Sequence, residues 1–305
     1  MPETSPQYGL SGNILHGPDG GNYNDIIYNN GTLTISTRPS GGGGGYTPPT
    51  YKVESEVAEE TDGSVSLSTG SAKKGDTVTI TVTPDPYYQV EEVIVKDSNG
   101  KIIEVTENKD GTFSFEMPAS KVSVEAVYVW ENPFVDVAEG TFYIDAVEWA
   151  LKNGITEGTG EDTFSPVASC TRAQMVTFLW RAAGSPEPAS ADCQFADMDM
   201  NSYYGKAVLW AVENGITNGT TGATFSPDME CSRAQMAAFL CRMADGEAVS
   251  DESTFVDVKA DAYYAESVQW AVENGITEGI GEGKYSPDAV CTRGQMVTFL
   301  YRYYN

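Results

Sequence analysis

The chain has 305 residues, and its 44 acidic and 18 basic residues give a formal net charge of −26 at neutral pH. So negative a charge argues against nucleic acid and anionic membranes as nonspecific partners. No apolar run approaches the ~18 residues that a spanning helix needs, so we expect no membrane span. The first residues lack the basic and apolar parts of a signal peptide, and we therefore expect the native protein to extend further at its N-terminus.

Residues 1–40 are polar and rich in glycine and asparagine. Two short segments, 24–28 and 32–36, flank an Asn-Asn-Gly turn, which predicts a β-hairpin. We interpret residues 1–40 as a fragment of an upstream β segment. Residues 41–50 contain a run of glycines followed by Thr-Pro-Pro, a composition that predicts a flexible linker with a stiffer end.

Residues 51–130 show the pattern of a small all-β module. Residues 77–83 alternate threonine with valine or isoleucine, which is typical of a half-buried strand. Further short apolar segments are separated by the turn signals at 99–100 and 110–111. Several short strands at this spacing predict a small immunoglobulin-like sandwich. The segment resembles the β-repeat modules of bacterial surface proteins, of the divergent internalin-type or flagellin-like kind. It contains no catalytic constellation, so we interpret it as a spacer.

The rest of the chain repeats one pattern three times. Residues 134–181 align without gaps with residues 195–242 and with residues 255–302. Each copy contains Phe-x-Asp, an aromatic pair, Trp-Ala, Asn-Gly-Ile-Thr, Phe/Tyr-Ser-Pro and Cys-Thr/Ser-Arg-x-Gln-Met, in this order. Such self-similarity predicts one structural unit used repeatedly. We expect three mainly α, helix-loop-helix repeats, which lie at 131–184, 192–245 and 252–305.

The first helix of repeat 1 is expected over residues 142–153, where apolar residues recur at helical spacing and Gly154 marks the end. The tryptophan of Trp-Ala lies off this apolar stripe in every copy. These tryptophans are Trp149, Trp210 and Trp270. Two interpretations are open: the indole stacks on a sugar ring, or it packs against a neighbouring repeat.

The second helix begins with a capping box, Thr171 and Gln174 in repeat 1. An arginine follows the cap in each copy, in the first turn, where its charge opposes the helix dipole. These arginines are Arg172, Arg233 and Arg293. An arginine beside free helix N–H groups suits a carboxylate, and we favour an anion site over a salt bridge to the aspartate of Phe-x-Asp. The helix dipole alone explains the arginines at the other helix end, Arg181, Arg242 and Arg302.

The aspartate of Phe-x-Asp is a further candidate, at Asp136, Asp197 and Asp257. It either accepts hydroxyl groups of a ligand or caps a turn. A calcium loop starting at Asp197 is rejected, because Ser202 and Val208 stand where glycine and glutamate are needed. The chain has five cysteines, none of them spaced as C-x-x-C, and one histidine. We therefore expect reduced structural thiols, no metal and no cofactor.

As an ensemble, the motifs from residue 131 onward resemble a C-terminal trio of S-layer homology domains. The resemblance implies a pseudo-threefold bundle that binds secondary cell-wall polysaccharide linked to peptidoglycan, often through a pyruvylated sugar, in grooves between repeats. It gives the contact with the anionic sugar to Arg172, Arg233 and Arg293. It also implies that the loop glycines contribute backbone groups to the binding grooves. These glycines are Gly158, Gly219 and Gly279. The resemblance also implies an extracellular location in the cell wall or S-layer of a Gram-positive-type bacterium.

The copies depart from the family pattern in three ways. Glutamine replaces the glutamate of Thr-Arg-Ala-Glu in every copy, Gly294 replaces alanine in the third, and cysteine replaces an aliphatic residue before the cap. These changes keep the capping box but bear on whether the three grooves bind equally.

We favour a non-enzymatic, non-covalent anchor of a secreted surface protein. The alternative is an S-layer or adhesion protein that acts by assembly with lattice neighbours. A third hypothesis is a fragment of a wall-bound glycoside hydrolase, for which the sequence singles out no carboxylate pair.

Overall fold

The computed structural model describes residues 48–55, 62–248 and 254–305, together with the backbone of short strands within the first 36 residues. These strands are β1 (Gly9–Ser11), β2 (Ile14–His16), β3 (Asn22–Tyr23), β4 (Asp25–Asn29) and β5 (Thr32–Ser36). Strands β4 and β5 pair antiparallel, which confirms the predicted hairpin. Residues 41–47 of the expected linker lie outside the described residues.

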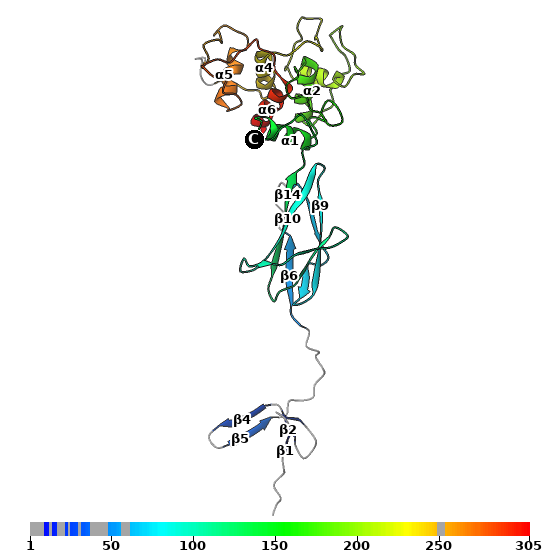
Figure 1. The fold of residues 1–305 in the computed structure, drawn as a ribbon. Helices are drawn as coiled ribbons and strands as arrows, with labels where there is room; N and C mark the ends of the chain where they lie inside the picture. The colour runs from blue at the N-terminus through cyan, green and yellow to red at the C-terminus, as the bar shows by residue number, and fades with distance from the viewer. Residues whose placement is uncertain are drawn as a thin grey trace, which may run out of the picture.

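The next segment of the chain forms a sandwich of two sheets (Figure 1). Its strands are β6 (Thr50–Ser55), β7 (Gly63–Leu67), β8 (Ser71–Lys73), β9 (Thr77–Pro84), β10 (Tyr88–Asp97), β11 (Ile102–Ile103), β12 (Thr106–Glu107), β13 (Phe113–Glu116) and β14 (Val122–Trp130). One sheet has the order β11-β10-β14-β6-β8 and the other β12-β13-β9-β7, with β14 and β6 parallel. The predicted all-β module is therefore confirmed.

The period-two pattern explains the core of this sandwich. In β9, Val78 and Ile80 are fully buried, whereas the neighbouring threonines point toward the other face. They meet Val95 of β10, Phe115 of β13 and Val124 of β14 in one hydrophobic cluster. Because both sheets contribute to this cluster, apolar burial holds the two layers together, whereas the strands' hydrogen bonds act within each sheet.

Six helices follow in the described residues, two in each repeat (Figure 1). They are α1 (Ile144–Lys152), α2 (Arg172–Ala182), α3 (Gly205–Glu213), α4 (Arg233–Met243), α5 (Ala265–Glu273) and α6 (Arg293–Tyr304). Helix α1 buries Ala146, Val147, Ala150 and Leu151, as its apolar stripe predicts. It starts two residues later than expected, so the aromatic pair at 142–143 precedes the helix.

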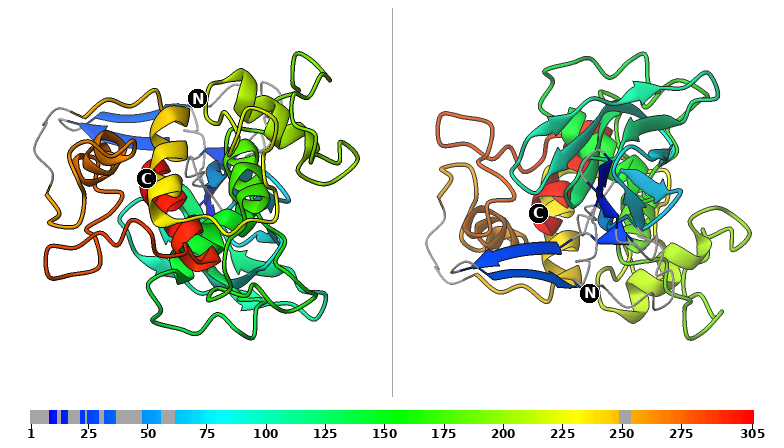
Figure 2. Two further views of the ribbon diagram at one scale, coloured as in Figure 1. Left: turned by 90° about the horizontal axis from the view of Figure 1, so that it is seen from above. Right: turned by 90° about the horizontal axis from the view of Figure 1, so that it is seen from below.

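The repeats interleave instead of folding side by side. The first helix of each repeat packs on the second helix of the preceding one: α3 on α2, α5 on α4, and α1 on α6 to close the ring. Helices α2, α4 and α6 converge near the centre, in green, yellow and red in Figure 2. Most apolar side chains of the three repeats consequently share one core. The expected pseudo-threefold bundle is confirmed.

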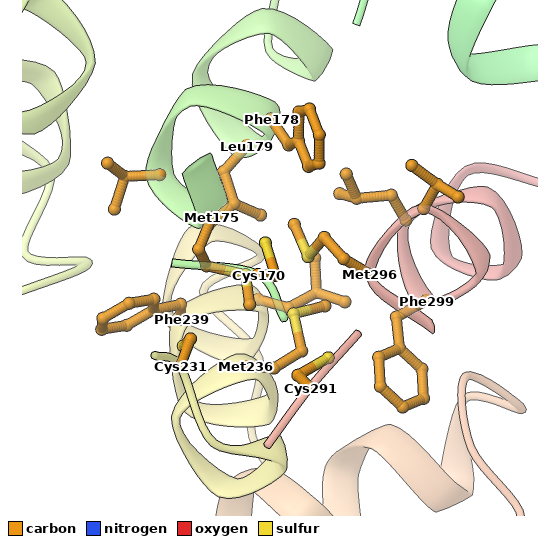
Figure 3. Packing of buried hydrophobic residues seen from close by; sticks show 14 of the residues in the cluster. Cys170, Met175, Phe178, Leu179, Cys231, Met236, Phe239, Cys291, Met296 and Phe299 are labelled. Carbon is orange, nitrogen blue, oxygen red and sulfur yellow. The ribbon is translucent and has the colours of Figure 1, made fainter. Parts of the chain in front are cut away.

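Three cysteines mark the pseudo-threefold axis. The backbone N–H of Cys170 donates to the carbonyl of Cys291 at 2.9 Å, Cys231 donates to Cys170 at 2.9 Å, and Cys291 donates to Cys231 at 2.8 Å. Figure 3 shows their side chains gathered with Met236 and Met296 between the helices. We call Cys170, Cys231 and Cys291 the axis cysteines. A small apolar side chain suits this crowded position, which accounts for cysteine here.

All five cysteines are free thiols, as expected. Burial raises the pKa of Cys170 and Cys231 to about 12 and that of Cys291 well above its usual range. The axis cysteines are therefore protonated and unreactive at neutral pH.

The sandwich contacts repeat 1 through polar groups. The Tyr88 hydroxyl donates to Glu148 Oε1 at 2.7 Å, and Lys152 Nζ lies 2.5 Å from Asp62 Oδ1. The Lys152 ammonium also lies 5.7 Å from the centre of the Tyr88 ring. Burial, with the charge and hydrogen bond of Glu148, raises the pKa of Tyr88, so this phenol stays a donor. These contacts join β10 and the residue that precedes β7 to α1 across the domain boundary.

Candidate functional site

The N-terminus of each second helix is buried against the next repeat. In α2, the Thr171 hydroxyl accepts from the N–H of Gln174, and the Gln174 side chain accepts from the N–H of Thr171. The next two N–H groups leave the repeat: Arg172 donates to the carbonyl of Met229 at 2.9 Å and Ala173 to that of Pro227 at 3.0 Å. The expectation of free helix N–H groups is therefore corrected. The next repeat already satisfies them, so they offer no anion site.

The arginine side chain follows its backbone into the neighbouring repeat. Arg172 Nε donates to the carbonyl of Phe225 at 2.9 Å. Its guanidinium carbon lies 4.8 Å from the ring centre of Phe225 and 5.2 Å from that of Phe239. Two aromatic faces thus flank the cation, each contributing roughly 0.5–2 kcal/mol of attraction. This explains how an arginine is tolerated at a helix start that its charge disfavours.

The same arrangement recurs in cyclic order. Arg233 of repeat 2 bonds to the carbonyl of Tyr285 in repeat 3, at 2.9 Å. Arg293 of repeat 3 bonds to the carbonyl of Phe164 in repeat 1, at 3.0 Å. The flanking rings are Tyr285 and Phe299 for Arg233, and Phe164 and Phe178 for Arg293, at 4.7 to 5.4 Å. Each repeat therefore inserts one guanidinium into the next.

These guanidinium groups are buried and make no ion pair with a carboxylate, although the charges of Asp197 and Asp136 act on Arg172 and Arg293 from a longer range. Arg172, Arg233 and Arg293 are 2%, 4% and 4% exposed, and Nη2 of each has no hydrogen-bond partner. Among the described residues, no ion pair joins them to a carboxylate. Burial lowers the pKa of Arg172 and Arg293, yet a guanidinium remains charged at neutral pH. A buried, unpaired cation is costly, and a bound anion relieves that cost.

The alternative salt bridge to Phe-x-Asp does not form, because the aspartates are engaged elsewhere. Asp197 accepts from the N–H groups of Phe225 and Ser226, one on each carboxylate oxygen, at 2.8 and 2.7 Å. Asp136 and Asp257 hold the equivalent Phe/Tyr-Ser backbone in repeats 1 and 3. The three aspartates thus bind the backbone of the segment whose carbonyl accepts the hydrogen bond from the arginine. Of the two roles considered for them, this is the capping of a turn.

For Asp197 and Asp257, burial alone would raise the pKa. The backbone hydrogen bonds and a nearby positive charge outweigh this effect, so both pKa values fall below the usual range. The carboxylates consequently stay ionised at neutral pH.

Three equivalent grooves lie over the arginines, and we number each by the repeat that supplies its loop and second helix. Groove 1 is lined by Thr156, Glu157, Gly158, Thr159, Gln174, Thr177, Phe178, Arg181, Tyr203 and Arg293. Groove 2 is lined by Arg172, Thr217, Asn218, Gly219, Thr220, Gln235, Ala238, Phe239, Arg242 and Tyr263. Groove 3 is lined by Phe142, Arg233, Thr277, Glu278, Gly279, Ile280, Gln295, Thr298, Phe299 and Arg302. All three repeats contribute to every groove.

A second arginine in each groove corrects the interpretation of the helix C-termini. Arg181, Arg242 and Arg302 were expected to need only the helix dipole. In the structure they line the grooves and donate through Nη1 to the carbonyls of Ile155, Ile216 and Ile276, at 3.1 to 3.3 Å. Each groove therefore presents two guanidinium groups, one from its own repeat and one from the preceding repeat. Their recurrence at the same position in three copies was the sequence signal that could have identified them as groove residues.

The aromatic groups in the grooves are not the predicted ones. Phe142, Tyr203 and Tyr263 are mostly exposed and line the grooves, each edge-on to the aromatic residue that follows it. Each is the first residue of the repeated aromatic pair, a motif to which the sequence assigned no role. An exposed ring beside two cations offers a face on which a sugar can stack.

The tryptophans pack between repeats. Trp149 of α1 lies 5.9 Å from the ring of Tyr301 and 5.6 Å from that of Tyr304, both in α6. Trp210 and Trp270 are buried on helices that pack on the preceding repeat. None of the three lines a groove. Trp149 makes the inter-repeat contact of the two interpretations, whereas the ring of Trp270 lies 6.0 Å from that of Tyr303 in its own repeat.

The three loop glycines line the grooves and are required by sterics. Gly219 has a φ of +83°, and a Cβ on it would lie 2.4 Å from the carbonyl oxygen of Thr224. Gly158 and Gly279 share this conformation and crowding. Their N–H groups are bonded to the preceding threonine hydroxyls, as Gly219 is to Thr217 at 3.2 Å. They shape the loops and bring backbone to the groove walls.

The grooves have no lining suited to hydrolysis or metal binding. At most one carboxylate lines each, Glu157 in groove 1 and Glu278 in groove 3, whereas glycoside hydrolysis uses two. In the part of the chain that the structure describes, no cluster of three or more metal-ligating side chains occurs. Nor does any helix there have the length and apolar character to cross a membrane.

Fold and grooves together define the class: a β-sandwich carrying a cyclic three-repeat bundle with cation-lined grooves. More specifically, the chain contains three S-layer homology domains, matched at 133–176, 194–237 and 254–297, preceded by a divergent InlB B-repeat domain at 51–132.

Similar proteins include surface-layer proteins. The chain is 29% identical over 153 residues, 49% of its own length, to the Surface-layer 125 kDa protein of Lysinibacillus sphaericus, covering 13% of that protein. It is 26% identical over 193 residues (62% of the chain) to an S-layer protein of Bacillus thuringiensis subsp. finitimus, covering 23% of it. An Endoglucanase of Bacillus sp. (strain KSM-635) is 30% identical over 169 residues (53% of the chain), covering 18% of the enzyme. The chain thus spans less than a quarter of each relative.

The recurrence of this region in S-layer proteins associates the chain with the bacterial cell surface. The match to the endoglucanase covers a small part of that enzyme and says nothing of catalysis by this chain.

Proposed function

We propose that the three repeats anchor a secreted surface protein non-covalently to the bacterial cell wall, by binding an anionic, pyruvylated secondary polymer in the inter-repeat grooves. The observation that carries the proposal is the buried guanidinium in each groove, whose Nη2 has no hydrogen-bond partner and which forms no ion pair with a carboxylate. A carboxylate on the sugar would supply the missing charge and accept hydrogen bonds from the arginines. The exposed ring at the groove would stack on the sugar face.

The division of the chain supports the same proposal. The grooves use only the three repeats, so the β-sandwich is free to act as a spacer between the wall and any upstream segment. The net charge of −26 would repel an anionic wall polymer over most of the surface. Specific binding would therefore depend on the grooves, where two arginines are concentrated in each.

The test is co-sedimentation with purified cell walls of the source bacterium, before and after the secondary polymer is stripped. The wild-type chain is expected to sediment with intact walls and to remain in solution with stripped ones. The triple variant Arg172→Gln, Arg233→Gln, Arg293→Gln is expected to lose sedimentation, because glutamine keeps a donor but removes the charge.

A control separates charge from folding. Circular dichroism must show the helices of the triple variant intact at the assay temperature. The variant Lys73→Gln removes an exposed charge from the sandwich and should sediment like wild type. Sedimentation of a folded triple variant at the wild-type level would refute the proposal. Equal binding to stripped walls, or lattice formation without polymer, would favour protein assembly instead.

A further inference from the structure

The three grooves differ at four of their ten lining positions. The largest difference in charge is at the residue that follows the loop threonine. Groove 2 has Asn218 there, whereas groove 1 has Glu157 and groove 3 has Glu278. Every groove carries two arginines, but only groove 2 carries them without an acidic residue. A glutamate on the wall repels an incoming anion and weakens the field of both guanidinium groups.

Groove 3 also has fewer polar groups. Its aromatic residue is Phe142, which lacks the hydroxyl of Tyr203 and Tyr263. Its loop carries the exposed Ile280 where the other grooves have a threonine. Groove 3 thus lacks a phenolic hydroxyl that could bond to a sugar, and it lacks the threonine hydroxyl that in the other grooves bonds within the loop.

The space in the grooves sets groove 3 apart, whereas grooves 1 and 2 are of similar size. Groove 2 has a volume of about 440 Å³, groove 1 about 400 Å³ and groove 3 about 250 Å³. Groove 2 has Ala238 where the others have Thr177 and Thr298, whose hydroxyls donate to the backbone of their own helix. Replacing that threonine by alanine makes room without removing a donor from the groove.

Groove 2, like groove 1 with Tyr203, also combines its cations with a phenol. Burial raises the pKa of Tyr263, although the nearby charges of Arg242 and Arg172 act to lower it. The hydroxyl therefore stays protonated in the field of both arginines. It can donate to the same anion that the arginines attract.

We propose that groove 2 is the principal site for the sugar carboxylate, that groove 1 is a weaker site and that groove 3 does not bind it. Asn218 is the specificity-determining residue: an uncharged side chain at this position admits the anion, and glutamate at the equivalent position opposes it. This inference rests on the proposed function, because it ranks the grooves that the anchor would use.

The experiment compares single variants in binding isotherms on intact purified walls. Arg172→Gln, Arg293→Gln and Arg233→Gln each remove the inserted arginine from groove 2, 1 and 3 respectively. Arg172→Gln should weaken binding at least tenfold, Arg293→Gln a few-fold, and Arg233→Gln less than twofold. Asn218→Glu should weaken binding about tenfold, since it places a negative charge beside two functional cations. Thermal melts must show each variant folded.

A reciprocal variant keeps the test independent of folding damage. Glu157→Asn makes groove 1 resemble groove 2 and should strengthen binding, or restore several-fold the binding lost in Asn218→Glu. Gain of binding is not the result expected of a misfolded protein once pelleting in the absence of walls is subtracted. Equal losses in the three arginine variants, or no effect of Asn218→Glu, would overturn the ranking of the grooves.

Soluble competitors identify the carboxylate. A pyruvate-ketal hexosaminide and a glucuronide are compared with the neutral hexosaminide, each displacing the wild-type chain from walls. Competition by either acidic sugar, with the neutral sugar at least tenfold weaker, supports a carboxylate site; equal competition by the neutral sugar would overturn it. Absence of wall binding by the wild-type chain would refute the proposed function itself, whereas wild-type binding with equal losses refutes only this inference.

Discussion

A single methyl group in the groove loop should destabilise the repeats far more than the same group three residues away. Gly219 lies at a φ of +83°, where a residue with a Cβ pays about 1–2 kcal/mol. The added carbon would lie 2.4 Å from the Thr224 oxygen and 2.5 Å from the Phe195 ring, and relieving such overpacking costs about 1–3 kcal/mol more. Gly219→Ala should therefore cost about 2–5 kcal/mol.

The same loop contains a matched control. Gly222 has no atom within 4 Å of an added Cβ, and its φ does not fall in the left-handed range. Gly222→Ala should change stability by less than about 0.5 kcal/mol. Thermal melts followed by the helical circular dichroism signal measure both variants. For a domain of this size, Gly219→Ala should lower Tm by about 5–15 °C. Equal melting of the two variants would refute the steric reasoning.

Three further predictions follow from protonation and from the domain boundary. Iodoacetamide at pH 8 should modify the half-buried Cys193 while the axis cysteines react only after denaturation, as mass spectrometry of the labelled protein can show; rapid native labelling of an axis cysteine would contradict their burial and raised pKa. The pKa values of Asp197 and Asp257 are lowered in the fold, so the stability they contribute is complete above the unfolded pKa of about 4 and is lost as the pH falls through their folded pKa. Melts from pH 7 to pH 2 should show Tm falling below about pH 4, with a smaller fall in Asp197→Asn; an unchanged acid limb in that variant would count against the linkage. Lys152→Ala removes the contact with Asp62 and should broaden the range of domain orientations in small-angle scattering, whereas a profile identical to wild type would show that the contact does not hold the domains.

The local part of the structure could be predicted because its information lies within a few residues. The alternation at 77–83 gave a strand with Val78 and Ile80 buried. The capping boxes formed as expected in all three copies, since the groups they join are three residues apart. Triplication identified one structural unit, and the position of its arginine against the helix dipole singled that residue out, although the free N–H groups expected beside it are absent.

What the arginine meets was decided only by the tertiary structure. Arg293 bonds to Phe164, 129 residues away, because the repeats close into a ring and each second helix starts against the next repeat. The same closure occupies the helix N–H groups that had been expected to be free, brings the C-terminal arginines into the grooves, and places the tryptophans between helices. Sequence periodicity describes which face of a helix is apolar, but not which helix covers it. The sequence by itself therefore determined the repeating unit and its unusual cation, whereas ring closure determined that the cation is buried, unpaired and shared between two repeats.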